Sequence, residues 1–142
     1  MYPQNIKVTV DALVFSDEAA ERRLLLIKRK NEPNKGMWAF PGGFVEDDED
    51  LDTAVKRELA EETGVKLQAM TQLHTFGKVG RDPRGRTISV AYTAFVKYQD
   101  HPATGSDDAA EASWIKITDI DALAFDHKAI LDFALKKMKQ PI

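Results

Sequence analysis

The spacing of apolar and polar residues predicts two strands and a short apolar segment in the first third of the chain. Residues 6–15 alternate apolar with polar side chains, which is typical of an exposed strand. Residues 23–30 follow a turn-like Ser-Asp pair, and their Leu-Leu-Leu-Ile centre predicts a buried strand. Residues 37–40 are a short apolar run that the Pro-Gly-Gly sequence at 41–43 ends.

Two segments carry apolar residues at helical spacing. A helix is expected over 51–63, with Asp50 as its N-cap and Gly64 as the residue that closes it. A second helix is expected over about 126–139, where one face collects the apolar residues Ile130, Leu131, Ala134, Leu135 and Met138.

Between these helices the pattern returns to strands. Residues 67–78 and 87–98 flank a segment with strong turn chemistry at 80–85, so we expect them to form a long hairpin. A polar loop at 99–108 then leads to a short strand over 113–117.

Length and composition indicate one globular domain spanning residues 1–142. A chain of 142 residues, 43% of them hydrophobic, can bury a core without disulfides or a structural metal. There are no cysteines, which excludes disulfides and thiolate metal sites. No secretory leader pattern or membrane-spanning apolar run is visible in the sequence, so we expect a cytoplasmic protein without membrane contact.

Charge is the next informative feature. The formal net charge is −3, and no uninterrupted basic stripe is present, which argues against nucleic-acid binding. Acids gather in one place: nine of the 17 residues from Glu46 to Glu62 are Asp or Glu, against two bases. If this segment handles phosphates, a cation must lie between the two sets of negative charge.

The acidic helix has an unusual face. On a helical wheel Leu51, Val55, Leu59 and Glu62 fall in one sector, so the apolar stripe turns acidic toward its end. Like charges at i, i+3 and i+4 destabilise a helix unless something neutralises them, and Glu58, Glu61 and Glu62 have this spacing. A hard divalent cation such as Mg²⁺ would do so. Taken alone, the helix is also compatible with a solvated surface helix whose glutamates pair with lysines.

The spacing around the helix adds a second observation. From Gly43, five residues lead to Glu49, seven more lead to Arg57, and the sequence continues Arg-Glu-Leu-Ala-Glu-Glu-Thr-Gly-Val. These 23 residues, Gly43 to Val65, resemble the Nudix box, the signature of the Nudix hydrolase family. One position departs from its commonest form, since Asp48 stands where glycine often precedes the glutamate.

The resemblance implies a fold and a set of roles. It implies a three-layer α/β/α sandwich with a mixed sheet, in which the box forms a loop, a helix and a loop. Mg²⁺, with Mn²⁺ as a substitute, would be held by Glu58, Glu61, Glu62 and the carbonyl of Gly43. Arg57 would orient a glutamate through a charge-assisted pair, and Glu49 would be its partner and help with the metal. Water would then attack a phosphorus atom of a pyrophosphate.

Segments outside the box resemble the ADP-ribose pyrophosphatase-like branch of the family and the related Nudix domains of NAD-metabolism and sugar-responsive regulators. They are 8–11, 38–44, 81–86, 107–114 and 125–127. The expected reaction is hydrolysis of a nucleoside diphosphate derivative, above all ADP-ribose to AMP and ribose 5-phosphate, by a homodimer. Two alternatives stay open: a nucleoside triphosphate pyrophosphohydrolase and a non-catalytic nucleotide-sugar sensor.

Several basic residues are candidates for substrate binding. Arg81, Arg84 and Arg86 would grip substrate phosphate or a dimer partner, or else Asp-Pro-Arg-Gly only makes a hairpin turn with solvated arginines. Arg29 would meet phosphate or lie at a solvated strand end. Trp38 would stack on the adenine base or pack in the core.

One further acid and the histidines complete the candidates. Glu111, after an acidic loop, is the candidate for an acid outside the box that positions water or a second metal. His127 follows a predicted N-cap, Asp126, and is interpreted as structural. His74 and His101 have no recognisable partner in the sequence.

Overall fold

A mixed sheet forms the centre of the computed structural model, which describes residues 3–18, 21–105 and 109–139. Within these residues the sheet has seven strands in the order β3-β2-β1-β6-β5, with β4 paired to β1 and β7 paired to β2. The strands are β1 (Lys7–Glu18), β2 (Glu21–Arg29), β3 (Trp38–Ala39), β4 (Gly42–Phe44), β5 (Thr71–Phe76), β6 (Thr87–Phe95) and β7 (Ala109–Lys116). The helices are α1 (Leu51–Thr63) and α2 (His127–Met138), with the 3₁₀ turns η1 (Tyr98–Asp100) and η2 (Ile117–Asp119).

Strand β1 changes partner along its length. On one side it runs parallel to β6, from the pair Lys7↔Thr87 to the pair Phe15↔Phe95. On the other side it pairs antiparallel with β4 near its start and with β2 near its end. Between them, the N–H of Ala12 donates to the carbonyl of Pro41 at 2.8 Å. The Pro-Gly-Gly segment, where the chain passes from β3 to β4, therefore lies next to the centre of β1.

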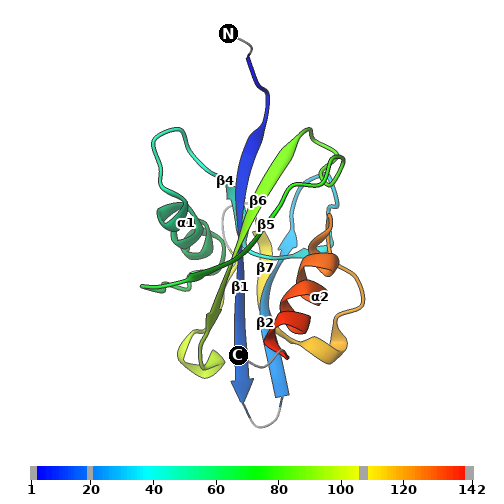
Figure 1. Ribbon diagram of the computed structural model, residues 1–142. Coiled ribbons are helices and arrows are strands. Elements are labelled where there is room, and N and C mark those ends of the chain that lie inside the picture. Colours follow the sequence, from blue (N-terminus) through cyan, green and yellow to red (C-terminus); the bar gives the residue numbers. More distant parts are fainter. Residues whose placement is uncertain (1–2, 19–20, 106–108, 140–142) are drawn as a thin grey trace.

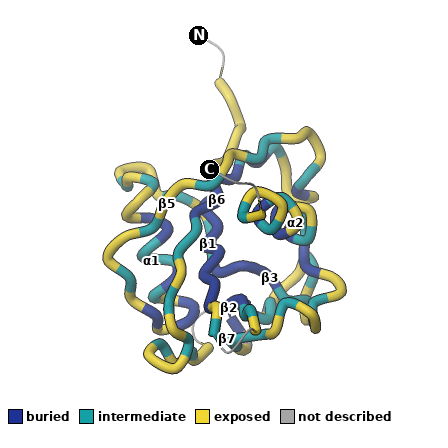
Figure 2. Tube along the Cα trace, turned by 60° about the horizontal axis from the view of Figure 1, so that its bottom comes forward, coloured by how far each residue is buried: buried dark blue, intermediate teal, exposed yellow. Residues whose placement is uncertain are grey.

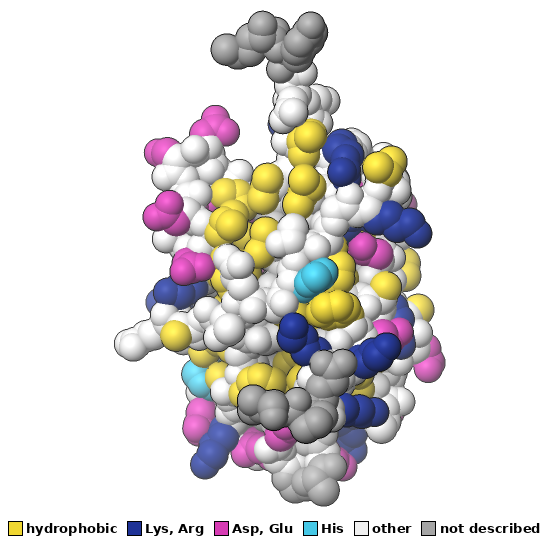
Figure 3. Space-filling view, viewed as in Figure 1, with side chains coloured by type: hydrophobic (Ala, Val, Ile, Leu, Met, Phe, Trp, Pro, Cys, Tyr) yellow, Lys and Arg dark blue, Asp and Glu magenta, His cyan; other side chains and the backbone are white. Residues whose placement is uncertain are grey.

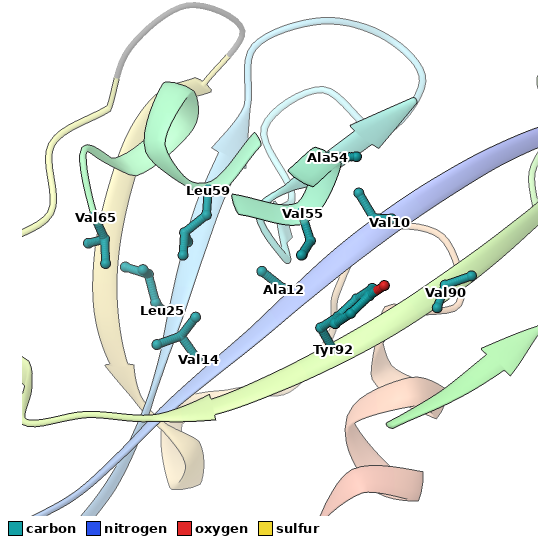
Figure 4. Close-up of a cluster of buried hydrophobic side chains, with 10 residues drawn as sticks. All are labelled: Val10, Ala12, Val14, Leu25, Ala54, Val55, Leu59, Val65, Val90 and Tyr92. Carbon is teal, nitrogen blue, oxygen red and sulfur yellow. The ribbon is translucent and has the colours of Figure 1, made fainter. Parts of the chain in front are cut away.

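The two helices cover opposite faces of the sheet, which gives three layers (Figure 1). Alternate residues of β1 serve the two faces, because side chains of a strand point up and down in turn. Those at 10, 12 and 14 pack with Val55 and Leu59 of α1 in the cluster of Figure 4. Those at 13 and 15 pack with Ile130 and Leu131 of α2. Figure 2 shows the resulting buried centre of β1.

Because helices cover both faces of β1, one prediction was wrong. The segment 6–15 was expected to be an exposed strand, but β1 is buried from Thr9 to Ser16. Asp11 shows why the pattern was misleading: its carboxylate is buried beside His127 of α2 and accepts a hydrogen bond from the Oγ of Ser89 at 2.5 Å. A polar residue in a strand is therefore not always on a solvent face.

Most other elements lie where the sequence placed them. Helix α1 has the predicted bounds, and Gly64 closes it in a left-handed conformation with φ of 78°. Strands β5 and β6 form the predicted antiparallel hairpin, although β5 is shorter than expected. The strand predicted over 113–117 is longer, because β7 pairs with β2 from Arg23 to Arg29. Neither helix in the described ranges is long and apolar enough to cross a membrane.

Candidate functional site

A cleft of about 510 Å³ opens beside the second half of α1 and the Pro-Gly-Gly loop. Its walls come from β1, β2, β4, α1, the turn before β6 and the start of α2. The residues of the predicted site that line it are Arg29, Gly43, Arg57, Glu58, Glu62, Arg81 and Arg84. Figure 3 shows acidic side chains along the edge of the molecule that α1 and the preceding loop form.

The buried face of α1 carries one acid into this cleft. Val55, Leu59 and Glu62 are buried together, which confirms the sector predicted from the helical wheel. The carboxylate of Glu62 accepts a hydrogen bond from the N–H of Gly42 at 2.7 Å. The row of apolar side chains thus ends in a carboxylate that is bonded to the loop backbone.

Glu58 lies against the same loop. A Cβ on Gly43 would lie 2.6 Å and 2.8 Å from the two carboxylate oxygens of Glu58, so only glycine leaves room for this side chain. Burial raises the pKa of Glu58, the charges of Glu61 and Glu49 raise it further, and Arg57 opposes them. The carboxylate of Glu58 is therefore both partly shielded from solvent and close to other negative charges.

Arg57 ties the acids together. Its Nε and Nη2 donate to the two oxygens of Glu49 at 2.5 Å and 2.9 Å, and its Nη1 donates to Glu58 at 3.0 Å and to Glu61 at 3.2 Å. Nη2 also donates to the carbonyl of Phe44 at 3.3 Å. These hydrogen bonds lower the pKa of Glu49 and raise that of Arg57, so both groups are held in their charged forms. One guanidinium fixes three carboxylates and the end of β4.

The donors suit a hard divalent cation. Carboxylate oxygens with a backbone carbonyl are the ligands that Mg²⁺ prefers, and Glu58, Glu62 and Gly43 supply them at one wall of the cleft. As they stand, no three Asp, Glu or His side chains in the described ranges are arranged to hold an ion, since Arg57 binds Glu58 and Glu61. The chemistry of the set fits a divalent metal, because a bound cation would stabilise the charged form of Glu58, whose pKa is raised first by burial and then by Glu61 and Glu49.

Three further arginines line the same cleft, each held by a partner. Arg81 makes a bidentate pair with Asp126 at 2.9 Å and 2.7 Å, and its side chain is 4% exposed. The guanidinium of Arg84 donates to Asp82 at 3.1 Å and 2.8 Å. The Nε of Arg29 donates to the carbonyl of Pro33 at 2.8 Å. These hydrogen bonds fix the three guanidinium groups before a ligand binds, which suits them to bind an anion of defined shape.

Two phenylalanines that the sequence analysis missed complete the cleft. The guanidinium of Arg84 lies 4.8 Å from the ring centre of Phe44 and 5.0 Å from that of Phe125. Arg29 lies 4.8 Å from the ring of Phe125. Phe125 has a φ of 53°, a left-handed conformation that is rare for a bulky residue and that concentrates at functional sites. The sequence Phe-Asp-His at 125–127 resembles the ADP-ribose pyrophosphatase-like branch, and this resemblance was the signal that could have pointed to Phe125.

A buried histidine closes the inner end of the cleft. His127 is 5% exposed, and the N–H of Phe40 donates to its Nδ1 at 3.1 Å. Its Nε2 lies 3.6 Å from Asp11. Burial lowers the pKa of His127, outweighing the nearby acids, so the ring is neutral near pH 7. Asp126, predicted as the N-cap of α2, makes no capping side-chain bond and binds Arg81 instead.

Five predicted residues lie outside the cleft lining formed by the described residues, and Glu49, which is hydrogen-bonded to Arg57, is one of them. Trp38 packs with the α2-side cluster, and Lys28 lies 5.8 Å from its ring. Arg86 donates to the carbonyl of Gly77 at 2.7 Å. Glu61, with a 46% exposed side chain, binds the outer side of Arg57. Glu111 is exposed on β7, opposite Lys28 of β2.

Comparison with known protein families matches residues 5–133 to the NUDIX domain. Among curated proteins, the chain is 41% identical over 124 residues to an ADP-ribose pyrophosphatase of Methanocaldococcus jannaschii, covering 87% of this chain and 70% of that protein. It is 34% identical over 142 residues to the ADPR responsive transcriptional repressor NtrR of Acinetobacter baylyi. That match covers 96% of this chain but 56% of the repressor, so the chain spans little more than half of it.

Comparison with solved structures also finds similarity to a NUDIX domain. The NUDIX domain of Shewanella oneidensis NrtR, complexed with ADP ribose, superposes with a TM-score of 0.88 at 34% identity. The match covers 97% of this chain and 91% of that domain. The similarity therefore extends over the sheet, both helices and the cleft.

Proposed function

Because this chain belongs to the Nudix family, we propose that it is a Mg²⁺-dependent hydrolase that cleaves the pyrophosphate bond of a nucleoside diphosphate derivative. The preferred substrate is ADP-ribose, with AMP and ribose 5-phosphate as products. The observation that carries the proposal is the joining of Gly43, Glu58, Arg57 and Glu62 in one cleft that also contains three arginines. The name of the Methanocaldococcus relative supports the choice of substrate.

Each part of the cleft has a role in this proposal. Gly43, Glu58, Glu61 and Glu62 would hold Mg²⁺ or Mn²⁺. When bound, the ion neutralises charge that develops on the phosphate oxygens and promotes ionisation of water. Arg57 keeps Glu49 and Glu58 oriented, and the N–H of Gly42 holds Glu62 in place.

The remaining residues bind substrate. Arg29, Arg81 and Arg84 supply positive charge for the two phosphates, in positions fixed by their own hydrogen bonds. Phe44 and Phe125 supply aromatic rings for contact with the base, next to the guanidinium of Arg84, which lies over both rings. The sequence had left this role open for Trp38, with core packing as the alternative. Arg86 and Glu111 keep the roles suggested by the sequence only if they move toward the cleft on binding.

One assay tests this function. The purified protein is incubated with Mg²⁺ and, in separate reactions, with ADP-ribose, other nucleotide sugars and nucleoside triphosphates, and the release of AMP or pyrophosphate is followed. We expect AMP and ribose 5-phosphate from ADP-ribose, and no turnover in EDTA. Pyrophosphate release from triphosphates alone would replace this proposal with the triphosphate pyrophosphohydrolase. The variant Glu61→Gln/Glu62→Gln should abolish turnover in either case.

A non-catalytic sensor is the second candidate, favoured by the similarity to a repressor described as ADPR responsive. Isothermal titration with ADP-ribose distinguishes the two. A sensor would bind ADP-ribose without metal-dependent turnover, whereas the enzyme would consume it.

We also propose that the chain acts as a homodimer. The apolar side chains of Ile6 and Val8 are 38% and 37% exposed at the start of β1, and Figure 3 shows hydrophobic side chains on this upper part of the surface. Burial of such side chains between two copies would stabilise a dimer. Sedimentation equilibrium should therefore give twice the chain mass.

A further inference from the structure

The buried His127 connects α2 to the loop that carries the predicted metal ligand Gly43. It is the first residue of α2 and is 5% exposed. Its ring stacks on that of Phe40, with the ring centres 4.5 Å apart and an interplanar angle of 16°. Phe40 stands immediately before the Pro-Gly-Gly sequence.

Each residue from 40 to 42 is fixed by a different element. The N–H of Phe40 donates to the Nδ1 of His127 at 3.1 Å, and the carbonyl of Pro41 accepts from the N–H of Ala12 on β1 at 2.8 Å. The N–H of Gly42 donates to Glu62 of α1 at 2.7 Å. Helix α2, strand β1 and helix α1 thus hold three consecutive residues just before Gly43.

The imidazole ring can accept the hydrogen bond from Phe40 in only one orientation of the ring. A neutral ring has one acceptor nitrogen, and because Nδ1 accepts from Phe40, the proton is on Nε2. Nε2 faces the carboxylate of Asp11 at 3.6 Å. Asp11 is fixed in turn by the hydroxyl of Ser89 at 2.5 Å. The ring is therefore oriented by the hydrogen bond at Nδ1 and by stacking on Phe40, with its Nε2 edge toward Asp11.

We propose that His127 is a positioning residue for cleavage, which holds residues 40–43 so that the carbonyl of Gly43 and the carboxylate of Glu62 lie together at the wall of the cleft. Its effect on turnover rests on the proposed function, whereas its effect on the loop does not. His127 acts through the backbone of Phe40. If it were only a packed core residue, its replacement would change stability alone.

Three variants separate these roles. His127→Phe keeps the stacked ring but removes the acceptor for Phe40. His127→Asn lacks the ring but places an acceptor oxygen close to the position of Nδ1. Leu131→Ala is the control, because Leu131 is 1% exposed on the same helix and contributes to the core without lining the cleft.

The kinetic readout separates kcat from KM with ADP-ribose and saturating Mg²⁺. We expect His127→Phe to lower kcat about 10-fold or more, as loss of a group that orients a metal ligand does, with KM within about 2-fold of wild type. His127→Asn should recover part of kcat although it packs less well. Leu131→Ala should keep the wild-type kcat well below its melting temperature.

Amide hydrogen exchange, followed by NMR in the metal-free protein, supplies a readout that needs no activity. His127→Phe should accelerate exchange at Phe40, Gly42 and Gly43 more than at the amides in the middle of α1. Leu131→Ala should change the exchange rates of the loop amides and of the α1 amides to a similar extent. If His127→Phe shows wild-type exchange in the loop, or if Leu131→Ala reproduces the selective change, the proposal is overturned. A wild-type protein without turnover would refute the proposed function, and exchange would then decide the loop role by itself.

Discussion

The carboxylate of Glu58 lies against the backbone of Gly43, so closely that a methyl group on Gly43 would come within 2.6 Å of its Oε1. This contact joins helix α1 to strand β4 at the cleft wall, beside the hydrogen bonds from Gly42 to Glu62 and from Arg57 to Phe44. The carbonyl proposed to bind metal and one of the carboxylates proposed to bind it belong to this pair. Any side chain at position 43 would therefore have to displace the Glu58 carboxylate.

Gly43→Ala should therefore disable the metal site without unfolding the protein. The added methyl must displace the Glu58 side chain, and we expect kcat to fall about 10- to 100-fold, as for loss of ligand orientation. Steady-state kinetics across a Mg²⁺ titration measure this loss. Gly77→Ala is the matched control, because its Cβ would meet nothing closer than 3.7 Å. Equal activity of the two variants would contradict the role of this contact.

Arg57→Lys tests whether the planar guanidinium is needed. Lysine keeps the charge but cannot bind Glu49 with two parallel hydrogen bonds while also reaching Glu58. We expect kcat to fall about 10-fold or more. Arg22→Lys is the control, since Arg22 forms a similar fork with Asp17 at an exposed site away from the cleft. Wild-type kinetics in Arg57→Lys would show that charge alone suffices.

Phe125→Ala tests the aromatic wall. Stacking of a base on an aromatic ring contributes about 1–3 kcal/mol, so KM for ADP-ribose should rise about 5- to 150-fold with a smaller change in kcat. Phe125→Tyr keeps the ring and should keep KM. Phe95→Ala removes a 56% exposed phenylalanine that does not line the cleft and is the control. Unchanged KM in Phe125→Ala would remove Phe125 from the base site.

The sequence was most informative where function depends on local spacing. Glu58 and Glu62 stand one helical turn apart, so the helix alone brings them to one side, and the loop from Gly43 to Glu49 has a fixed length. The pairing of Arg57 with Glu49 was implied by the resemblance to the Nudix box, and the two side chains are hydrogen-bonded across this short loop. Interactions of this kind need only the geometry of a helix and a short loop.

Residues brought together by tertiary structure were harder to assign. Trp38 was considered for base binding because of its side chain and its place beside the loop, but β3 directs it to the α2-side cluster. Phe125 enters the cleft through a left-handed backbone conformation that no periodicity predicts for phenylalanine. Asp11 was assigned to an exposed face because its partner Ser89 is 78 residues away in the sequence.

A last prediction concerns stability and pH. The folded-state pKa of His127 is lowered from 6.5, chiefly by burial; Asp11 and Asp126 oppose this shift, and Arg81 and Arg29 add to it. The unfolded chain therefore binds this proton more readily than the folded protein does. Its contribution to the free energy of unfolding is fully present above pH 6.5 and is lost as the pH falls through the folded-state pKa.

Urea denaturation of the wild type and His127→Asn at several pH values between 7.5 and 5 measures this contribution. Their difference in unfolding free energy should shrink as the pH falls below 6.5, because only the wild type must then discard a proton to fold. Glu58, whose pKa is raised, acts in the opposite direction, but it is present in both proteins and cancels in the difference. Ile130→Val, which carries no titratable group, should differ from the wild type by the same amount at every pH. A difference between the wild type and His127→Asn that stays constant would mean that the folded and unfolded chains bind this proton equally well, and that burial does not lower the pKa of His127.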